Sequence, residues 1–240
     1  MPRLATRALA ALIALLSPIA LAEAQDAQAA ALFDRALTLP RADIFYAGKD
    51  QVAAEEMAKA IESSWDKVRI AANPRFDKRI TLYLYPDSAS YDASRERAGL
   101  PVHSKYRSHH VAPAEIHVRA TMHSGDAVHE LAHLFMESAR DPPFESPWID
   151  ESICASLAGQ STVNRGGFRT SFDHRAYDFT RPDLEDRYYV FAFYFIGNFL
   201  FETYPPERVA ELARTGSVQA AFGVSDAEFR AAWLGWVERR

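Results

Sequence analysis

The sequence predicts an α+β fold, with a small sheet-containing N-terminal lobe, a central helix and a helical C-terminal lobe. Three observations support this prediction. Residues 79–85 and 114–120 alternate between apolar and polar side chains, as half-buried strands do. Residues 53–68 place apolar side chains three or four positions apart, which is the helical period. From residue 124 onward the pattern is mainly helical.

The first 24 residues have the pattern of an export signal. Arg3 and Arg7 precede an uncharged run rich in Ala and Leu at residues 8–22, and residues 22–24 form a small-residue cleavage site. This run of 15 residues is shorter than the roughly 20 that span a membrane, and no later stretch is long and apolar enough. We therefore expect cleavage after residue 24 and a secreted or periplasmic bacterial protein. An uncleaved N-terminal anchor is the alternative.

The remaining chain is long enough for a single domain. Without 24 residues the chain of 240 keeps 216, which can bury a core of its own without disulfides. We expect this domain over residues 25–240, with the sheet lobe at about 41–123 and the helical lobe at about 124–240. Loss of two Arg and one Glu with the leader changes the formal net charge from -5 to -6. A mildly acidic protein lacks the positive field that binds phosphate backbones, so we expect no nucleic-acid partner.

The N-terminal lobe is expected to begin with a helix, a strand and a second helix. Residues 25–40 have the composition of a short lead-in helix, and residues 43–47 that of a strand. The second helix, at 53–68, should face the core with its apolar stripe. That stripe consists of Met57, Ile61, Trp65 and Val68.

Two further strands precede the central helix. The strand at 79–85 should end at Pro86. The strand at 114–120 places Ile116 and Val118 on one face and polar side chains on the other. If this second strand lies at an edge of the sheet, an extended peptide can add to it through backbone hydrogen bonds. An ordinary strand with one polar face explains the pattern equally well.

Two helices are expected after residue 123. The first should occupy 124–139 with Ser124 as its N-cap, because Pro142 and Pro143 forbid its continuation. The second is expected at 148–158. These two helices frame the segment in which the chemistry of the chain is concentrated.

The rest of the chain is expected to be a loop followed by helices. Residues 160–187 are polar and without period, so we expect a long loop, which in a compact domain is often functional. Two or three helices should close the chain. The last of them begins with the capping box at 225–228.

The segment His129-Glu130-Leu131-Ala132-His133 is an HExxH motif inside the predicted helix. Residues four apart on a helix share a face, so both imidazoles can reach one zinc ion at roughly 2.0–2.1 Å. Glu130, one position after His129, points away from the face that the two histidines share. It can take a proton from a metal-bound water without binding the metal. The motif therefore supplies two ligands and a base. Two hydrogen-bonded helix histidines without a metal are the structural alternative.

A catalytic zinc needs a third protein ligand. The metzincin class would place a His at position 139, which is Ala here, so that class is rejected. The next carboxylates are Glu137, Glu145, Asp150 and Glu151.

The motif and the segment after it resemble the gluzincin metallopeptidases, and most closely the peptidase MA-like group. HELAH is followed 18 positions after His133 by Glu151, in a helix that begins with Trp148. Further similarity lies in segments 82–86, 199–204 and 222–225, so the resemblance covers most of the mature chain. It implies a thermolysin-like core, a peptide or protein substrate, and one zinc ion per chain with His129, His133 and Glu151 as ligands.

The resemblance also implies a donor that stabilises the oxyanion formed from the attacked carbonyl. Tyr188 and Tyr189 match the place of this donor in the family, with core packing as the alternative for both, and His174 is a further candidate. The chain departs from the family at Ser152, where Gly is usual, and at Ala155, where an acid is frequent. The side chain that orients a zinc-bound histidine must therefore come from another position.

Several remaining side chains are expected to have no role in catalysis. Cys154 cannot form an intrachain disulfide or a thiolate cluster because it is the only cysteine, and its apolar neighbours indicate a buried position. Five histidines have no ligand spacing, and exposed loop positions explain them. They are His103, His109, His110, His117 and His123.

Two other functions stay open beside peptide hydrolysis. A zinc-dependent hydrolase of a non-protein amide would have the same metal site. A non-catalytic, zinc-stabilised binding module would need no base, so the presence of Glu130 argues against it.

Overall fold

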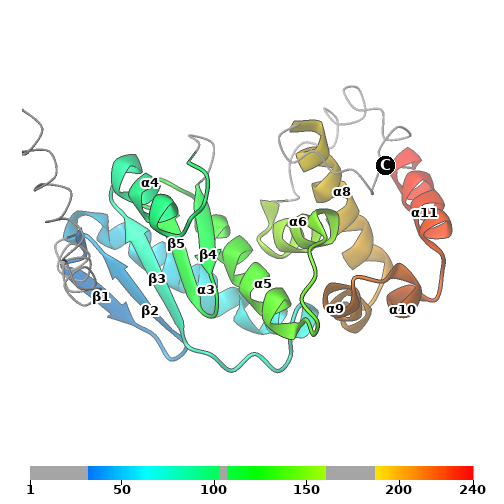
Figure 1. Ribbon diagram of the computed structural model, residues 1–240, viewed down its shortest axis with the longest axis horizontal. Coiled ribbons are helices and arrows are strands. Elements are labelled where there is room, and N and C mark those ends of the chain that lie inside the picture. The colour runs from blue at the N-terminus through cyan, green and yellow to red at the C-terminus, as the bar shows by residue number, and fades with distance from the viewer. Residues whose placement is uncertain (1–31, 103–106, 161–186, 240) are drawn as a thin grey trace, which may run out of the picture.

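A computed structural model describes residues 32–102, 107–160 and 187–239 of the chain. The fold is α+β, as predicted: a five-stranded mixed sheet and its helices form one lobe and a group of helices forms the other. Helix α5 (Ser124–Ala139) lies between the two lobes (Figure 1). The expected signal sequence at 1–24 lies outside the described residues.

The strands follow the order β1-β2-β3-β5-β4 across the sheet. The three central strands are parallel, and both edge strands are antiparallel to their neighbours. A parallel pair needs a long crossover, which the helices after β2 and after β3 provide. The strands are β1 (Arg35–Thr38), β2 (Ala42–Tyr46), β3 (Ile80–Tyr85), β4 (Ser108–Val111) and β5 (Glu115–Arg119).

The edges of this sheet correct two predictions. Strand β1 occupies part of the expected lead-in helix at 25–40, because its residues pair with β2, with Ala36 opposite Phe45. The strand predicted at 114–120 is β5, which lies inside the sheet between β3 and β4. Among the described strands, β4 has a partner only on its β5 side. The edge that faces α5 therefore belongs to β4, which the prediction did not contain.

Helices cover both faces of the sheet. Helix α3 (Gln51–Ala71) and α5 lie on one face, and α4 (Ser88–Arg97) lies on the other (Figure 1). The face toward α3 is apolar, since alternate strand residues such as Leu82 and Ile116 are fully buried there. Trp65 of α3 contacts Phe135 of α5 edge-on, with ring centroids 5.1 Å apart. Aromatic packing of this kind fixes α5 beside α3 and against the sheet.

Helix α5 has the predicted bounds, although its N-cap position is His123 instead of Ser124. Helix α6 (Pro147–Leu157) agrees with the predicted helix at 148–158 to within one residue. Gly159 follows it with a φ of 72°, a left-handed conformation that ends a helix without steric cost.

Within the described residues, the second lobe is formed by α6 with four further helices. Helix α8 (Arg187–Thr203) packs against α6. The chain then continues through α9 (Pro206–Thr215), α10 (Val218–Phe222) and α11 (Asp226–Glu238). The predicted capping box of α11 is confirmed by reciprocal hydrogen bonds between Ser225 and Glu228. None of the helices in the described ranges combines the length and apolar character needed to cross a membrane.

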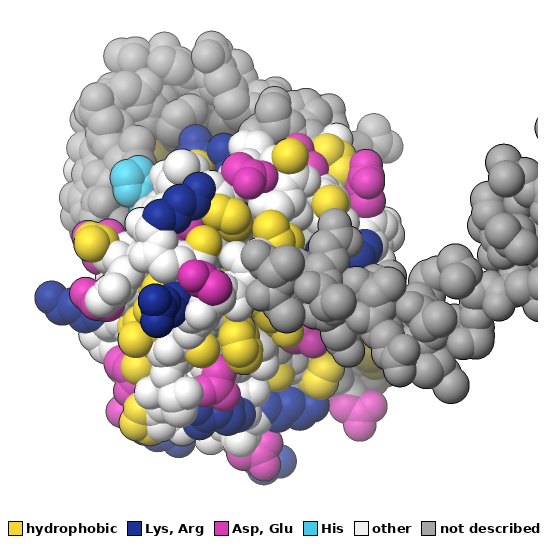
Figure 2. Space-filling model, turned by 90° about the vertical axis from the view of Figure 1, so that its left-hand side faces the viewer, with side chains coloured by type: hydrophobic (Ala, Val, Ile, Leu, Met, Phe, Trp, Pro, Cys, Tyr) yellow, Lys and Arg dark blue, Asp and Glu magenta, His cyan; other side chains and the backbone are white. Residues whose placement is uncertain are grey.

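Charged side chains of both signs are mixed on the face of the molecule at the β1 end (Figure 2). Elsewhere on the surface Arg79 pairs with Asp43 at 2.6 Å, and Arg41 with Asp66 at 3.4 Å. Exposed pairs of this kind contribute at most about 1 kcal/mol. Neither of these two pairs involves a residue of α5.

Gly197 is the point at which α8 approaches the backbone of α6. A Cβ added to Gly197 would overlap the carbonyl oxygen of Ser152 and come within 3.0 Å of the Cβ of Ser156. Ser152 is fully buried and directly follows Glu151. The absence of a side chain at position 197 thus sets the distance between the two helices.

We expect Gly197→Ala to destabilise the protein by about 1–3 kcal/mol, because the added methyl group must push α8 away from α6. Urea unfolding followed by circular dichroism measures this. Gly235→Ala in α11 is the matched control. Its Cβ would meet only the end of the Arg239 side chain, at 3.4 Å, so this change should stabilise by about 0.4–1 kcal/mol. Equal effects of both substitutions would contradict the assignment of Gly197.

Candidate metal centre

Helix α5 brings the two histidines of the motif together on one face. The Nε2 atoms of His129 and His133 are 3.1 Å apart. Their rings are largely buried, with 14% and 12% of each side chain exposed. Two ligand atoms of a tetrahedral zinc ion are about 3.3 Å apart when each is roughly 2.0–2.1 Å from the metal. The imidazole separation fits such an ion.

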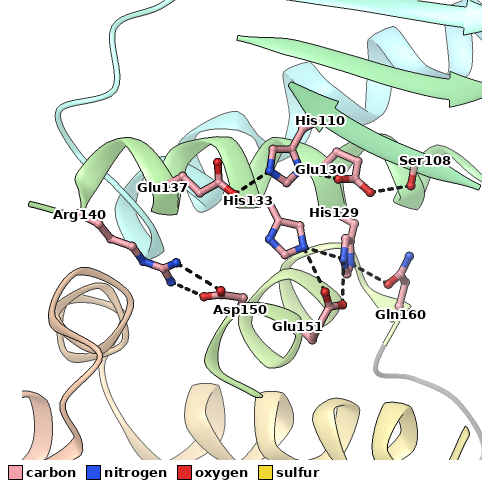
Figure 3. Close-up of polar contacts among 10 residues, drawn as sticks. All are labelled: Ser108, His110, His129, Glu130, His133, Glu137, Arg140, Asp150, Glu151 and Gln160. Carbon is pink, nitrogen blue, oxygen red and sulfur yellow. Dashed lines mark hydrogen bonds and ion pairs between the residues drawn. The ribbon is translucent and has the colours of Figure 1, made fainter. Parts of the chain in front are cut away.

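Glu151 of helix α6 faces both imidazoles (Figure 3). Its Oε2 lies 3.3 Å from Nε2 of His129, and its Oε1 lies 3.5 Å from Nε2 of His133. Each of these separations is close to the distance between two ligand atoms of a zinc ion, although each imidazole contacts a different oxygen of the carboxylate. Of the four carboxylates that the sequence left open, Glu151 is the one whose oxygens lie against both histidines. The residues present therefore fit a divalent ion such as zinc.

The charges in this triad stabilise one another. Burial raises the pKa of Glu151, but hydrogen bonds from His129 and His133 outweigh burial and hold that pKa well below its usual range. Burial also lowers the pKa of His129, and the hydrogen bond and negative charge of Glu151 reverse this effect and raise it to about 9. A cation that takes the place of the protons would keep the same attraction to the Glu151 carboxylate.

Cys154 is a second candidate for the third ligand. Its sulfur and one nitrogen from each of His129 and His133 lie within 4.8 Å of one another, a group that could hold a metal ion. The prediction that Cys154 is buried is confirmed, but its position beside the imidazoles was not predicted. Burial raises the pKa of the thiol well above its ordinary value, so Cys154 is protonated. Glu151 differs from Cys154 in that its carboxylate oxygens contact both imidazoles, at 3.3 Å and 3.5 Å, so geometry favours Glu151 as the third ligand.

Gln160 orients the His129 imidazole through Nδ1, the ring nitrogen that does not face Glu151. The Gln160 side-chain oxygen lies 3.1 Å from Nδ1 of His129, and its amide nitrogen donates to Oδ1 of Asp126 at 3.1 Å. Because the amide nitrogen faces the carboxylate, the oxygen must accept from Nδ1. This arrangement leaves the lone pair of Nε2 free for a metal. Gln160 thus orients a histidine of the motif, a contact that the Ala155 side chain cannot make.

Glu130 lies on the sheet side of α5, away from Glu151 (Figure 3). Ser108 of β4 donates to its Oε1 at 2.7 Å, and Nδ1 of His110, also on β4, lies 2.8 Å from its Oε2. Burial raises the pKa of Glu130, but the hydrogen bond from His110 and the positive charges of His133, His129 and His110 outweigh it and lower the pKa to about 2. Glu130 is therefore an ionised carboxylate, the form a base requires.

The prediction that the remaining histidines occupy exposed loops is wrong for three of them. His109 and His117 are buried in β4 and β5, where their rings stack with centroids 4.5 Å apart. His110 contacts Glu130. These contacts exist because residues 108–111 form strand β4, which the sequence did not predict. His123 is exposed, as expected, and His103 lies outside the described residues.

The predicted oxyanion donors are not placed by this structure. Tyr188 and Tyr189 lie in the first turn of α8, and their side chains are outside the described part of the molecule. His174 and most of the expected loop at 160–187 also lie outside it. The role of either tyrosine stays a prediction.

A buried ion pair fixes α6 relative to α5. The guanidinium of Arg140, just after α5, donates through both terminal nitrogens to the carboxylate of Asp150, in one case at 3.2 Å. Arg140 also donates to the backbone oxygens of Phe144 and Ala213 at 3.1 Å and 3.0 Å. Since Asp150 directly precedes Glu151, this pair sets the rotation of α6 that points Glu151 at the imidazoles.

The sequence matches no protein-family model and no curated protein.

The assignment of Glu151 predicts a difference between two substitutions on α6. Glu151→Ala removes a ligand of the metal. Its zinc affinity should therefore fall by more than the roughly 10–100-fold that is lost when a residue hydrogen-bonded to a ligand is removed. In Cys154→Ala, the zinc content should stay that of the parent. Elemental analysis of the purified proteins measures both. Loss of zinc from Cys154→Ala, with retention in Glu151→Ala, would reverse the assignment.

Proposed function

We propose that this chain is a zinc metallopeptidase of the gluzincin type, with His129, His133 and Glu151 as ligands and Glu130 as the base. The observation that carries the proposal is the contact of the Glu151 carboxylate with both imidazoles, at 3.3 Å and 3.5 Å. Three protein ligands leave one tetrahedral position for water, which distinguishes catalytic zinc sites from structural ones. The thermolysin-like core implied by the resemblance belongs to this proposal.

His129, His133 and Glu151 would hold a zinc ion, which would supply a lowered pKa for a bound water molecule and polarisation of the peptide carbonyl. Glu130 would accept a proton from the attacking water and return it to the leaving amine. Gln160 holds His129 in the tautomer that binds metal. Tyr188 or Tyr189 is the proposed donor to the oxyanion.

Strand β4 favours a peptide as the substrate. Its outer edge has no partner among the described strands, and an extended peptide can add there by main-chain hydrogen bonds. A cavity of about 430 Å³ adjoins the end of this strand. Ala112, Pro113, Leu134 and Phe144 provide much of its apolar lining. A small non-protein amide would use the same metal chemistry without needing the strand edge.

We expect Glu130→Gln to keep the zinc of the parent and to lose peptide hydrolysis by about 10²–10⁴-fold, because general base catalysis contributes that much. Cleavage of a mixed peptide library, followed by mass spectrometry, measures turnover, and elemental analysis measures zinc. Glu96→Gln on exposed α4 is the matched control and should behave as the parent.

Turnover of Glu130→Gln at the parent rate would show that Glu130 is not the base. Zinc in the parent without cleavage of any peptide would favour the hydrolase of a non-protein amide or the binding module.

A further inference from the structure

Strand β4 holds the carboxylate of Glu130 with two side chains. Ser108 and His110 are two positions apart on a strand, so they share a face, and that face is turned toward α5. His109 between them points to the opposite face, where it packs against Tyr91. One oxygen of Glu130 accepts from Ser108 at 2.7 Å and the other from His110 at 2.8 Å. Each carboxylate oxygen therefore has its own partner on β4.

His110 is itself fixed by a second carboxylate. Its Nε2 lies 2.7 Å from Oε1 of Glu137, which is two helical turns after Glu130 on α5. Both carboxylates are acceptors, so both ring nitrogens of His110 are donors. The imidazole bridges two turns of α5 and cannot rotate without losing a hydrogen bond.

Packing restrains the His110 ring in the remaining direction. Its ring lies against that of His133, with centroids 5.1 Å apart and planes inclined by 15°. The same ring thus contacts a proposed metal ligand with its face and the proposed base with its edge. With only 19% of its side chain exposed, His110 is also shielded from water.

We propose that His110 is a positioning residue that fixes the carboxylate of Glu130 relative to the metal site. A glutamate has three side-chain torsions, and the helix alone sets only where its side chain begins. A general base must lie within hydrogen-bond distance of the water molecule that it deprotonates, so conformational freedom of its carboxylate lowers the rate. A displacement of about 1 Å can lower the rate by about 10²-fold. This inference rests on the proposed function, because it assigns a role in that reaction.

A structural role is the competing explanation, in which His110 only attaches β4 to α5. Three substitutions separate the two roles. His110→Asn places an amide nitrogen near the position of Nδ1 and can keep the bond to Glu130, whereas His110→Gln reaches the position of Nε2 and can keep only the bond to Glu137. His110→Leu keeps neither bond. If His110 is a positioning residue, the side chain that reaches Glu130 should rescue activity.

The experiment compares the parent and the three variants by zinc content, thermal unfolding, and kcat and KM on one fluorogenic peptide that the parent cleaves. We expect zinc in all four proteins. His110→Gln and His110→Leu should lose kcat by up to about 10²-fold with KM little changed, and His110→Asn should recover most of that loss. Parent kcat in His110→Gln and His110→Leu, or equal losses in all three variants, would overturn the proposal.

A measurement without turnover separates this inference from the proposed function. Melting temperatures of His110→Leu, Glu130→Ala and the double variant form a cycle, and a non-additive shift shows that the two side chains interact. An additive cycle would remove the contact on which the inference rests, even in an active zinc enzyme. A parent that binds no zinc and cleaves no peptide would refute the proposed function and, with it, the positioning role. A non-additive cycle in that protein would still show that His110 and Glu130 interact.

Discussion

The metal centre depends on how helix α6 is folded back against α5. The proposed ligands come from both helices, and an imidazole and a carboxylate can share an ion only if the helices keep one separation and one rotation. Arg140 in the turn between them binds Asp150 at the start of α6 and two backbone oxygens nearby. A buried ion pair adds little net stability, but breaking it costs about 3–5 kcal/mol. The pair therefore specifies geometry more than it stabilises the fold.

The electrostatic character of the site follows from the same arrangement. Asp126, Glu130, Glu137 and Glu151 surround the imidazoles of α5, whereas the nearby Arg140 is neutralised by Asp150. The carboxylates raise the pKa of His129 to about 9 and, against the effect of burial, that of His110 to about 10. An excess of carboxylates around donor nitrogens is the environment that attracts a divalent cation.

The sequence predicted the parts of this structure that depend on local pattern. The bounds of α5 follow from its period and from Pro142-Pro143, and α6 follows from its apolar run and Gly159. The association of Glu151 with the two histidines was expected only through the resemblance, and the distances in the structure agree with it. Local pattern could not distinguish Glu151 from its neighbour Asp150, because the choice depends on the rotation of α6.

Features that depend on long-range pairing were not predicted. Strand β4 has four residues, two of them histidines, so its sequence carries no apolar alternation, and only pairing with β5 makes it a strand. Since β4 was missed, the contact of His110 with Glu130 was missed with it. Gln160 and Cys154 reach the imidazoles only because the chain after α5 reverses direction, which residue spacing alone does not reveal.

The close approach of α8 to α6 at Gly197 limits which substitutions the helical lobe tolerates next to the candidate site. The backbone of one helix is in contact with the other there, so a side chain cannot be added at position 197 without moving the helix that carries Glu151. By contrast, the turn at Ala112 and Pro113, which follows the short strand β4, borders a cavity of about 430 Å³. Larger side chains are therefore accommodated more easily beside β4 than between α6 and α8.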